Sequence, residues 1–199
     1  FIKTKYKIFY NKEPIYKDEQ IIFGNRNFNF FKIIKEAYLN RVSLSSTGFY
    51  KTPKIKFDKE KFLGRPFLYF CYGASVSEVT IDTLTGENTI DRVDILHDAG
   101  KPINPALEIG QIEGGFVQGQ GWLTIEELKW KSNGQITTFS PSTYKIPAVG
   151  DMPRKFNVEI YKDGINKEKV VNKAKTTGEP PLMLAMSVFY AIKDAIASV

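Results

Sequence analysis

A glutamate near the end of the chain has an unusual setting for a surface carboxylate. Glu179 lies between Gly178 and the double proline Pro180–Pro181, directly before an apolar segment that predicts a helix. The prolines restrict the backbone and lack amide protons, whereas the glycine permits a sharp turn. We expect the prolines to keep Glu179 out of the helix, with its carboxylate near the free N–H groups of the first turn.

Two roles for Glu179 remain open. A helix N-terminus favours the ionised carboxylate, whereas an apolar pocket favours the protonated form. These opposed influences suit a general base, which must be unprotonated and still accept a proton. The simpler alternative is that Glu179 only caps the helix.

A second group of notable residues lies in a glycine-rich stretch, residues 104–128. Asn104 is a good N-cap and Pro105 suits the first helical position, so a helix is predicted to begin there. Each glycine inside a helix costs about 1 kcal/mol relative to alanine, so several of them require a reason. The helix contains Gly110, Gly114, Gly115, Gly119 and Gly121. Either one face packs tightly against another backbone, or a bulky ligand comes close to it.

Two glutamines stand among these glycines. Gln111 and Gln118 are seven residues apart, so both amides project from roughly one side of the predicted helix. If a ligand approaches the helix, these amides are its candidate contacts. If the glycines serve packing instead, the amides have no such role.

The remaining reactive residue types are scarce. His97 is the only histidine, which excludes a histidine-based zinc site and a Ser-His-Asp triad; we expect it to be structural or at the surface. Cys71 is the only cysteine, which excludes an internal disulfide and fits a reducing compartment; we expect a small buried hydrophobe. No phosphate-binding loop or dinucleotide fingerprint is present. Any chemistry therefore depends on a carboxylate, or on a cofactor held largely without covalent ligands, and we predict no metal ligand.

Composition is ordinary for a globular protein, with 42% hydrophobic and 25% charged residues among 199. The net charge of +6 is uneven: residues 1–65 carry 15 Lys or Arg and 6 Asp or Glu, and the rest carries 13 and 16. The basic N-terminal third contains no nucleic-acid-binding motif, so we predict no nucleic-acid partner. No apolar run approaches the roughly 18 residues that span a bilayer, so we predict no membrane partner.

Hydrophobic spacing predicts how the elements alternate. A helix is expected at residues 30–42, then a loop with turn residues as far as Pro66, and then a hairpin from strands at 67–82 and 90–96. Further strands are expected at residues 3–10, a hairpin across 123–139, and strands at 155–163 and 169–175. Strands and helices are intermixed without a strict repeat, so the predicted fold class is α+β, with hairpins packed against the glycine-rich helix and a C-terminal helix.

Several stretches closely resemble the xanthine dehydrogenase and aldehyde oxidase family of molybdenum hydroxylases. They occur in the family's order and cover residues 36–199 almost without gaps, whereas residues 1–35 match poorly. The stretch at residues 39–53 resembles xanthine dehydrogenases more than aldehyde oxidases. The matching stretches are "LNRVSLSSTGFYKTP", "YGASVSEVTIDTLTGE", "NPALEIGQIEGGFVQGQGWLTIEEL", "PSTYKIPAVGDMP" and "GEPPLMLAMSVFYAIKDAI".

The resemblance implies roles for two residues. In that family the glutamate of the "GEPP" motif is the general base in the hydroxylation of a purine with water as the oxygen source, which corresponds to Glu179. The glutamine of "GQIEGG" hydrogen-bonds the molybdenum-pterin cofactor, which corresponds to Gln111. The neighbouring glycines then allow the cofactor to come close.

The resemblance also implies partners. The family's other substrate and cofactor motifs are absent here, so residues 36–199 are expected to be the C-terminal part of a molybdopterin-binding domain, preceded by a basic, aromatic-rich segment at 1–35. The cofactor would be shared with the missing part of that domain, and FAD and 2Fe–2S clusters would lie on other domains or subunits. We expect a cytoplasmic, dimeric complete enzyme oxidising hypoxanthine or xanthine, and no turnover by the isolated chain.

Two alternatives to this function stay open. The first is a relative that oxidises aldehydes or other N-heterocycles. The second is a non-catalytic binding or assembly module that has kept the fold. The intact "GEPP" and "GQIEGG" motifs argue against the second, because a module without catalysis does not need Glu179.

Overall fold

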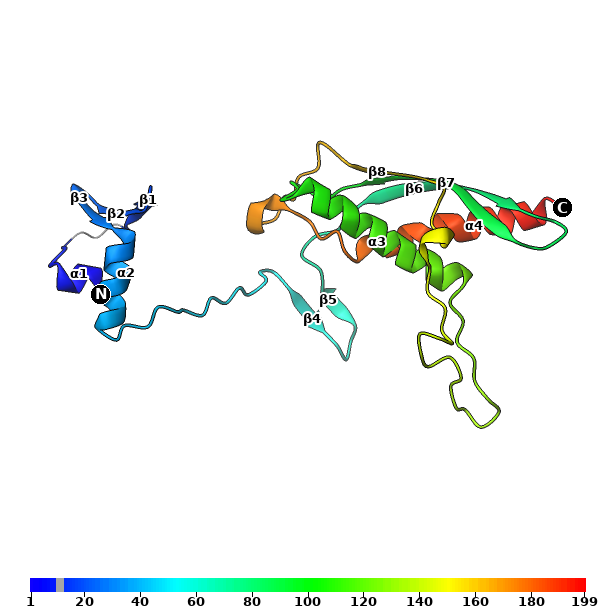
Figure 1. Ribbon diagram of the computed structural model, residues 1–199, viewed down its shortest axis with the longest axis horizontal. Helices are drawn as coiled ribbons and strands as arrows, with labels where there is room; N and C mark the ends of the chain where they lie inside the picture. Colours follow the sequence, from blue (N-terminus) through cyan, green and yellow to red (C-terminus); the bar gives the residue numbers. More distant parts are fainter. Residues whose placement is uncertain (10–12) are drawn as a thin grey trace. The chain divides into compact units, whose positions relative to one another are not determined.

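The computed structural model describes residues 1–9 and 13–199, and these form two compact units, Phe1–Thr52 and Pro53–Val199 (Figure 1). Each unit has a hydrophobic core of its own. The boundary between the units in the sequence follows Thr52. The sequence suggested a boundary after residue 35, which stays a prediction. Both units mix helices with sheets, which confirms the α+β class.

The N-terminal unit is a small antiparallel sheet with two helices. Its core is formed by Ile8, Ile21, Phe23 and Ile33. The three strands are joined in sequence order by tight turns, so β2 pairs with both β1 and β3. The elements are α1 (Ile2–Lys5), β1 (Ile15–Lys17), β2 (Gln20–Phe23), β3 (Arg26–Asn29) and α2 (Phe30–Leu39).

Helix α2 confirms the helix predicted at residues 30–42, although it ends at Leu39. It begins after Asn29, whose side-chain oxygen accepts a hydrogen bond from the Lys32 amide at 3.0 Å and so satisfies one free donor of the first turn. The strand predicted at residues 3–10 is wrong over the described residues 3–9, because Ile2–Lys5 form α1, Tyr6 and Lys7 form a turn, and Ile8 and Phe9 are in no strand. Residue 10 lies outside the described residues.

The C-terminal unit is organised around a three-stranded sheet in the order β6-β7-β8. Strands β6 and β7 form the predicted hairpin, and β8 then pairs with β7 in parallel. Because α3 lies between β7 and β8 in the sequence, it provides the crossover that a parallel pair requires. The strands are β4 (Lys56–Asp58), β5 (Leu63–Arg65), β6 (Gly73–Ile81), β7 (Asn88–His97) and β8 (Lys155–Ile160).

Helices α3 (Pro105–Thr124) and α4 (Met186–Ala197) lie on the same side of this sheet (Figure 1). Their apolar side chains meet the inward-facing residues of β7 in a single core. Phe116 also packs against Phe156 of β8, with ring centroids 5.4 Å apart. The buried members of this core are Ile90, Val93, Ile95, Ile112, Phe116, Ala185 and Val188.

Three predictions about local structure require correction. The hairpin predicted across residues 123–139 is reduced to an isolated bridge between Trp130 and Ile136, because α3 continues to Thr124. The strand predicted at residues 169–175 is wrong: Val171–Lys173 form a 3-10 turn, η2, and Asn172 and Lys173 have positive φ, which an extended strand does not accommodate. The region between residues 53 and 66 was expected to be a loop and instead contains the β4–β5 hairpin.

Three short 3-10 segments complete this unit: η1 (Val149–Asp151), η2 (Val171–Lys173) and η3 (Pro180–Ala185). Together η3 and α4 form the helical segment Pro180–Ala197, which is long and apolar enough to cross a membrane by length and composition. That corrects the expectation that no apolar run approaches this length. Only 17% of this segment is buried. Its buried residues Ala185 and Val188 belong to the core described above, so one face of the segment packs against the core.

Candidate active site

Two of the helical glycines in α3 allow a close contact with the segment that carries Glu179. A Cβ atom at Gly115 would lie 2.8 Å from the carbonyl oxygen of Gly178. A Cβ atom at Gly119 would lie 2.3 Å from the carbonyl oxygen of Leu182. Both distances are shorter than van der Waals contact, so only glycine lets the backbone of α3 lie against this segment.

Two other glycines of the same helix have no such neighbour. A Cβ atom at Gly110 or Gly114 would meet nothing within 4 Å, and both residues are exposed. The side chains of Gln111 and Gln118 are exposed on this part of the helix as well. The two interpretations of the glycines therefore apply to different residues: Gly115 and Gly119 serve packing, whereas Gly110 and Gly114 leave room for a ligand.

Glu179 stands at the N-cap position of η3. Its backbone oxygen accepts a hydrogen bond from the Leu182 amide at 3.1 Å, but its side chain makes no capping hydrogen bond. The capping role is therefore not supported. The expectation that the prolines keep Glu179 out of the helix is confirmed, because η3 begins at Pro180, although the φ and ψ of Glu179, −103° and −42°, lie in the right-handed helical region. The carboxylate remains exposed to solvent.

Gln111 lies beside the residue that precedes Glu179. Its side-chain oxygen is 3.2 Å from the position that a Cβ atom on Gly178 would take. Gln111 thus approaches the segment that carries Glu179, where α3 meets the beginning of η3. An amide that donates and accepts hydrogen bonds and a carboxylate without a side-chain partner in the fold make this a suitable place for a polar ligand.

No sequence pattern singled out Asp98 and Lys175, which hold this segment from the other side. The Lys175 ammonium lies 2.5 Å from a carboxylate oxygen of Asp98, and both side chains are largely buried. The Cys71 thiol donates to the carbonyl oxygen of Thr176 at 3.2 Å. Cys71 is half-buried and makes this polar contact, whereas a small buried hydrophobe was expected; desolvation is the main cause that raises the pKa of its thiol.

His97, the last residue of β7, is buried, with 1% of its surface exposed. Neither ring nitrogen has a hydrogen-bond partner. Burial is the main cause that lowers the pKa of His97 from its ordinary value of 6.5; the Lys175 charge also lowers it and the Asp98 charge opposes them. The imidazole is thus neutral at physiological pH, and its position in the core confirms a structural residue rather than a surface one.

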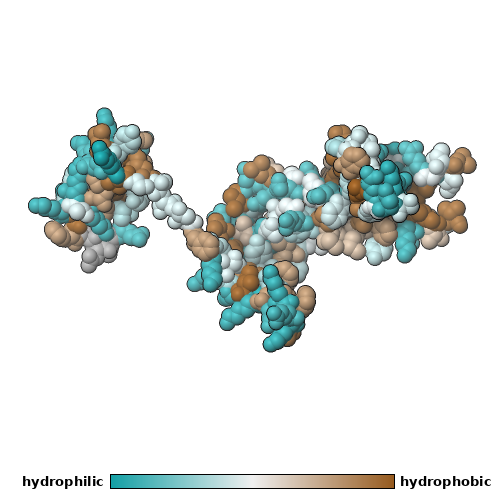
Figure 2. Space-filling model, turned by 90° about the horizontal axis from the view of Figure 1, so that it is seen from below, coloured by the Kyte–Doolittle hydropathy of each residue, from teal (hydrophilic) through white to brown (hydrophobic). Residues whose placement is uncertain are grey.

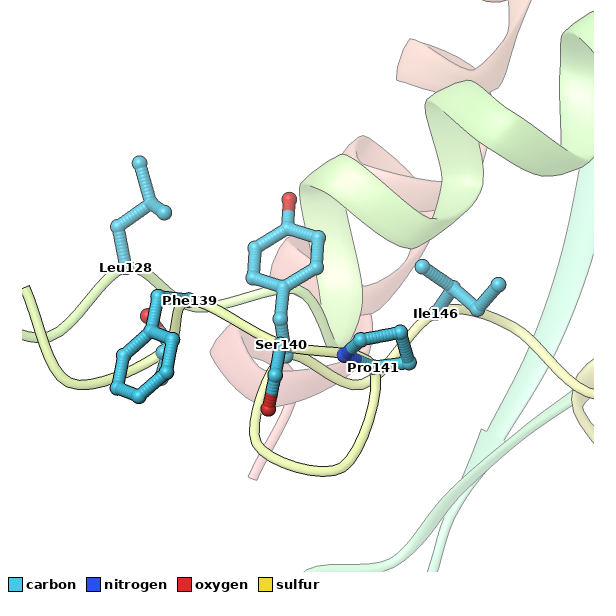
Figure 3. Close-up of a pocket in the computed structure, with 7 residues that line it drawn as sticks. Leu128, Phe139, Ser140, Pro141 and Ile146 are labelled. Carbon is cyan, nitrogen blue, oxygen red and sulfur yellow. The ribbon is translucent and has the colours of Figure 1, made fainter.

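An open apolar pocket of about 410 Å³ lies elsewhere, in the loops after α3 (Figure 3). None of the predicted site residues lines it. Figure 2 shows that hydrophobic areas (brown) interrupt the hydrophilic surface on the face it displays. The pocket is lined by Leu128, Thr138, Phe139, Ser140, Pro141, Tyr144 and Ile146.

No group of three or more His, Cys, Asp or Glu side chains within residues 1–9 and 13–199 is arranged to hold a metal ion. Gln111 and Glu179 are therefore suited to bind a cofactor or substrate through hydrogen bonds and proton transfer. Direct metal coordination would require other groups.

Known sequences resemble this chain over most of its length. A family model described as "Molybdopterin cofactor-binding domain" matches residues 5–153, which include Gln111 and the glycines of α3. The xanthine dehydrogenase/oxidase of Felis catus is 53% identical over 165 residues, and the xanthine dehydrogenase of Oryza sativa subsp. japonica is 48% identical over 182. These alignments cover 83% and 88% of the chain but only 12% and 13% of the two relatives.

Solved structures with the same fold include other oxidoreductases. Quinoline 2-oxidoreductase from Pseudomonas putida 86 aligns with a TM-score of 0.64 at 22% identity, covering 94% of this chain and 23% of that one. The aldehyde oxidoreductase from Desulfovibrio gigas aligns with a TM-score of 0.60 at 27% identity, covering 83% of this chain and 17% of that one.

Proposed function

Since the chain belongs to the molybdopterin cofactor-binding domain family, we propose that it acts as the C-terminal part of the molybdenum-binding region in a xanthine dehydrogenase-like hydroxylase. The proposed reaction is oxidation of hypoxanthine or xanthine with water as the oxygen source. The identities of 53% and 48% to two proteins named xanthine dehydrogenase support this substrate class.

The observation that carries the proposal is the approach of Gln111 to the segment containing Glu179. A residue for holding a cofactor and a residue for proton transfer lie within one neighbourhood, although 68 positions separate them in the sequence (179 − 111). Only the close contact of α3 with η3, which Gly115 and Gly119 permit, brings them together.

The residues present fit the pterin cofactor of this family. The exposed Gln111 amide is available to hydrogen-bond a polar ring system, and the open surface at Gly110 and Gly114 lets a large planar group come near the helix backbone. These residues supply part of a site, and we propose that the remainder of the molybdenum-binding region supplies the rest. When bound, the cofactor supplies the two-electron redox chemistry.

Within this proposal Glu179 is the general base. Its exposed carboxylate makes no side-chain capping bond, so an oxygen of Glu179 is free to accept the proton that the water-derived nucleophile loses. The backbone of Glu179 is fixed by the packed glycines on one side and by η3 on the other. Gln111 orients the cofactor and takes no proton.

The wider expectations belong to the same proposal. FAD and 2Fe–2S clusters would lie on other domains or subunits of a cytoplasmic dimer that binds neither nucleic acid nor a membrane. A second candidate, oxidation of an aldehyde, is favoured by the likeness to the aldehyde oxidoreductase from Desulfovibrio gigas. The higher identity to xanthine dehydrogenases ranks it below purine oxidation.

The test uses the complete enzyme. Glu179→Gln should keep its molybdenum and lower kcat by at least about 100-fold, because the proton acceptor is lost. Gln111→Ala should instead reduce molybdenum content. The matched control is Glu127→Gln, which changes a carboxylate that is 68% exposed and forms an ion pair with Lys129; its kcat should equal that of the unaltered enzyme.

A Glu179→Gln enzyme with a normal rate would remove this residue from the mechanism. The non-catalytic alternative is tested on native material. The polypeptide is captured from its source, and molybdenum per chain and hypoxanthine-dependent reduction of an electron acceptor are measured. A stable 22.6 kDa chain with neither metal nor activity would favour the binding module.

A further inference from the structure

We propose that the buried ion pair between Asp98 and Lys175 positions Glu179, so that Lys175 is a positioning residue for the proposed base. This inference rests on the proposed function, because it concerns the placement of the same glutamate. Lys175 touches neither the glutamate side chain nor Gln111 in the contacts described above, so any effect on catalysis is transmitted through the backbone.

The pair is enclosed and its geometry is close. The Lys175 ammonium is 2.5 Å from Asp98 Oδ2, and the two side chains are 8% and 15% exposed. The other carboxylate oxygen of Asp98 accepts a hydrogen bond from the Gly100 amide at 2.8 Å. The ammonium also lies 5.2 Å from the centroid of the Tyr72 ring, which is within the range of a cation–π interaction. Because both charged groups are removed from water, each needs the opposite charge of the other for its electrostatic stabilisation.

The backbone around Lys175 is joined to the end of β7. The Lys175 amide donates to the carbonyl oxygen of Ala99 at 2.8 Å, and the Lys101 amide donates to that of Lys173 at 3.0 Å. The buried Asn166 side chain donates to the Ala174 carbonyl oxygen at 3.0 Å. The chain therefore enters the "GEPP" motif from a point that is fixed to the sheet.

The three residues between Lys175 and Glu179 are each held. The Thr176 carbonyl oxygen accepts from the Cys71 thiol, and Thr177 is buried. The Gly178 carbonyl oxygen packs against Gly115 of α3. Glu179 is thus the exposed residue of a segment fixed upstream by Lys175 and downstream by the contact of η3 with α3.

Loss of one charge of the pair should free the backbone at Lys175, where the segment leading to Glu179 is held. Lys175→Met leaves the Asp98 carboxylate buried without its cation, and relief of that state requires the segment to move so that water can enter. A catalytic group displaced by about 1 Å can lose about 100-fold in rate. We therefore expect Lys175→Met to lower kcat by about 100-fold in the complete enzyme, with KM and molybdenum content within about twofold.

The experiment adds a readout that does not depend on turnover. Hydrogen exchange of the Lys175 amide, and of the peptide spanning residues 173–179, is measured in the complete enzyme for each variant. We expect exchange at least about 10-fold faster in Lys175→Met, because the hydrogen bond to Ala99 opens more often. Lys175→Arg keeps the charge and should recover much of the lost kcat. The matched control is Lys129→Met, which removes a lysine that is 61% exposed and should change neither readout.

The double variant Asp98→Asn, Lys175→Met keeps the inference testable if Lys175→Met does not fold. It leaves no unpaired charge in the interior, so it should fold and show faster exchange than the unaltered enzyme. If Lys175→Met does fold and the two residues act as one unit, the double variant should lose no more kcat than the worse of the single variants Lys175→Met and Asp98→Asn. Unchanged exchange in the residue 173–179 peptide would overturn the inference, as would faster exchange with unchanged kcat.

Glu179→Gln, measured in parallel, separates failure of this inference from failure of the proposed function. If Glu179→Gln retains full kcat, the base assignment fails, and the exchange data alone decide whether Lys175 fixes the segment. If Glu179→Gln is inactive while Lys175→Met has normal kcat, the assignment of Glu179 as the base is retained and the positioning role of Lys175 is rejected.

Discussion

Replacing Gly119 by alanine tests the close contact between α3 and η3. A Cβ atom there would lie 2.3 Å from the Leu182 carbonyl oxygen and 2.9 Å from the Ala185 Cβ. Neither atom can rotate away, so η3 must shift. Overpacking of this severity destabilises the fold by about 3 kcal/mol, and the better helix propensity of alanine stabilises it by about 1 kcal/mol. We expect the free energy of unfolding to fall by about 2 kcal/mol.

Gly114→Ala is the matched control, because the same substitution in the same helix adds a Cβ that meets nothing within 4 Å. Helix propensity alone should then raise the free energy of unfolding by up to about 1 kcal/mol. Urea unfolding followed by circular dichroism measures both variants. With a slope of about 2 kcal/mol per molar, the midpoint should fall by about 1 M for Gly119→Ala and rise by up to about 0.5 M for Gly114→Ala. Equal midpoints would refute the division of the glycines into packed and open positions.

Three further outcomes are expected. Because the folded-state pKa of His97 is lowered, the unfolded chain binds the proton more readily, and stability should decline as pH falls below 6.5. His97→Leu should preserve stability at about pH 8 and flatten that decline in urea midpoints; the same slope in both proteins would contradict this. Asn104→Ala removes the helix cap that accepts a hydrogen bond from the Leu107 amide at 3.4 Å, so the free energy of unfolding should fall by about 0.5 kcal/mol. An unchanged free energy of unfolding would show that this cap does not stabilise the helix. In the complete enzyme, Gly114→Ala should lower molybdenum content, and normal content would place the cofactor away from this face.

Much of the fold follows from local patterns. The predicted helix at residues 30–42, the β6–β7 hairpin and the beginning of α3 at Pro105 are confirmed, because hydrophobic spacing and capping residues act within a few positions of each other. The predictions that failed depend on other parts of the chain. The stretch at residues 169–175 is apolar enough for a strand, yet it forms a 3-10 turn because residues 99–101 and Asn166 take its hydrogen bonds.

The sequence by itself also determined which residues to consider, since the "GEPP" and "GQIEGG" stretches single out Glu179 and Gln111. It left open whether the glycines of α3 serve packing or a ligand. Only the tertiary structure decided that Gly115 and Gly119 contact η3 while Gly110 and Gly114 remain open, because residues one position apart on a helix face different neighbours. The burial of Lys175 against Asp98 was likewise beyond the sequence, because a lysine is usually exposed and its partner lies 77 residues away.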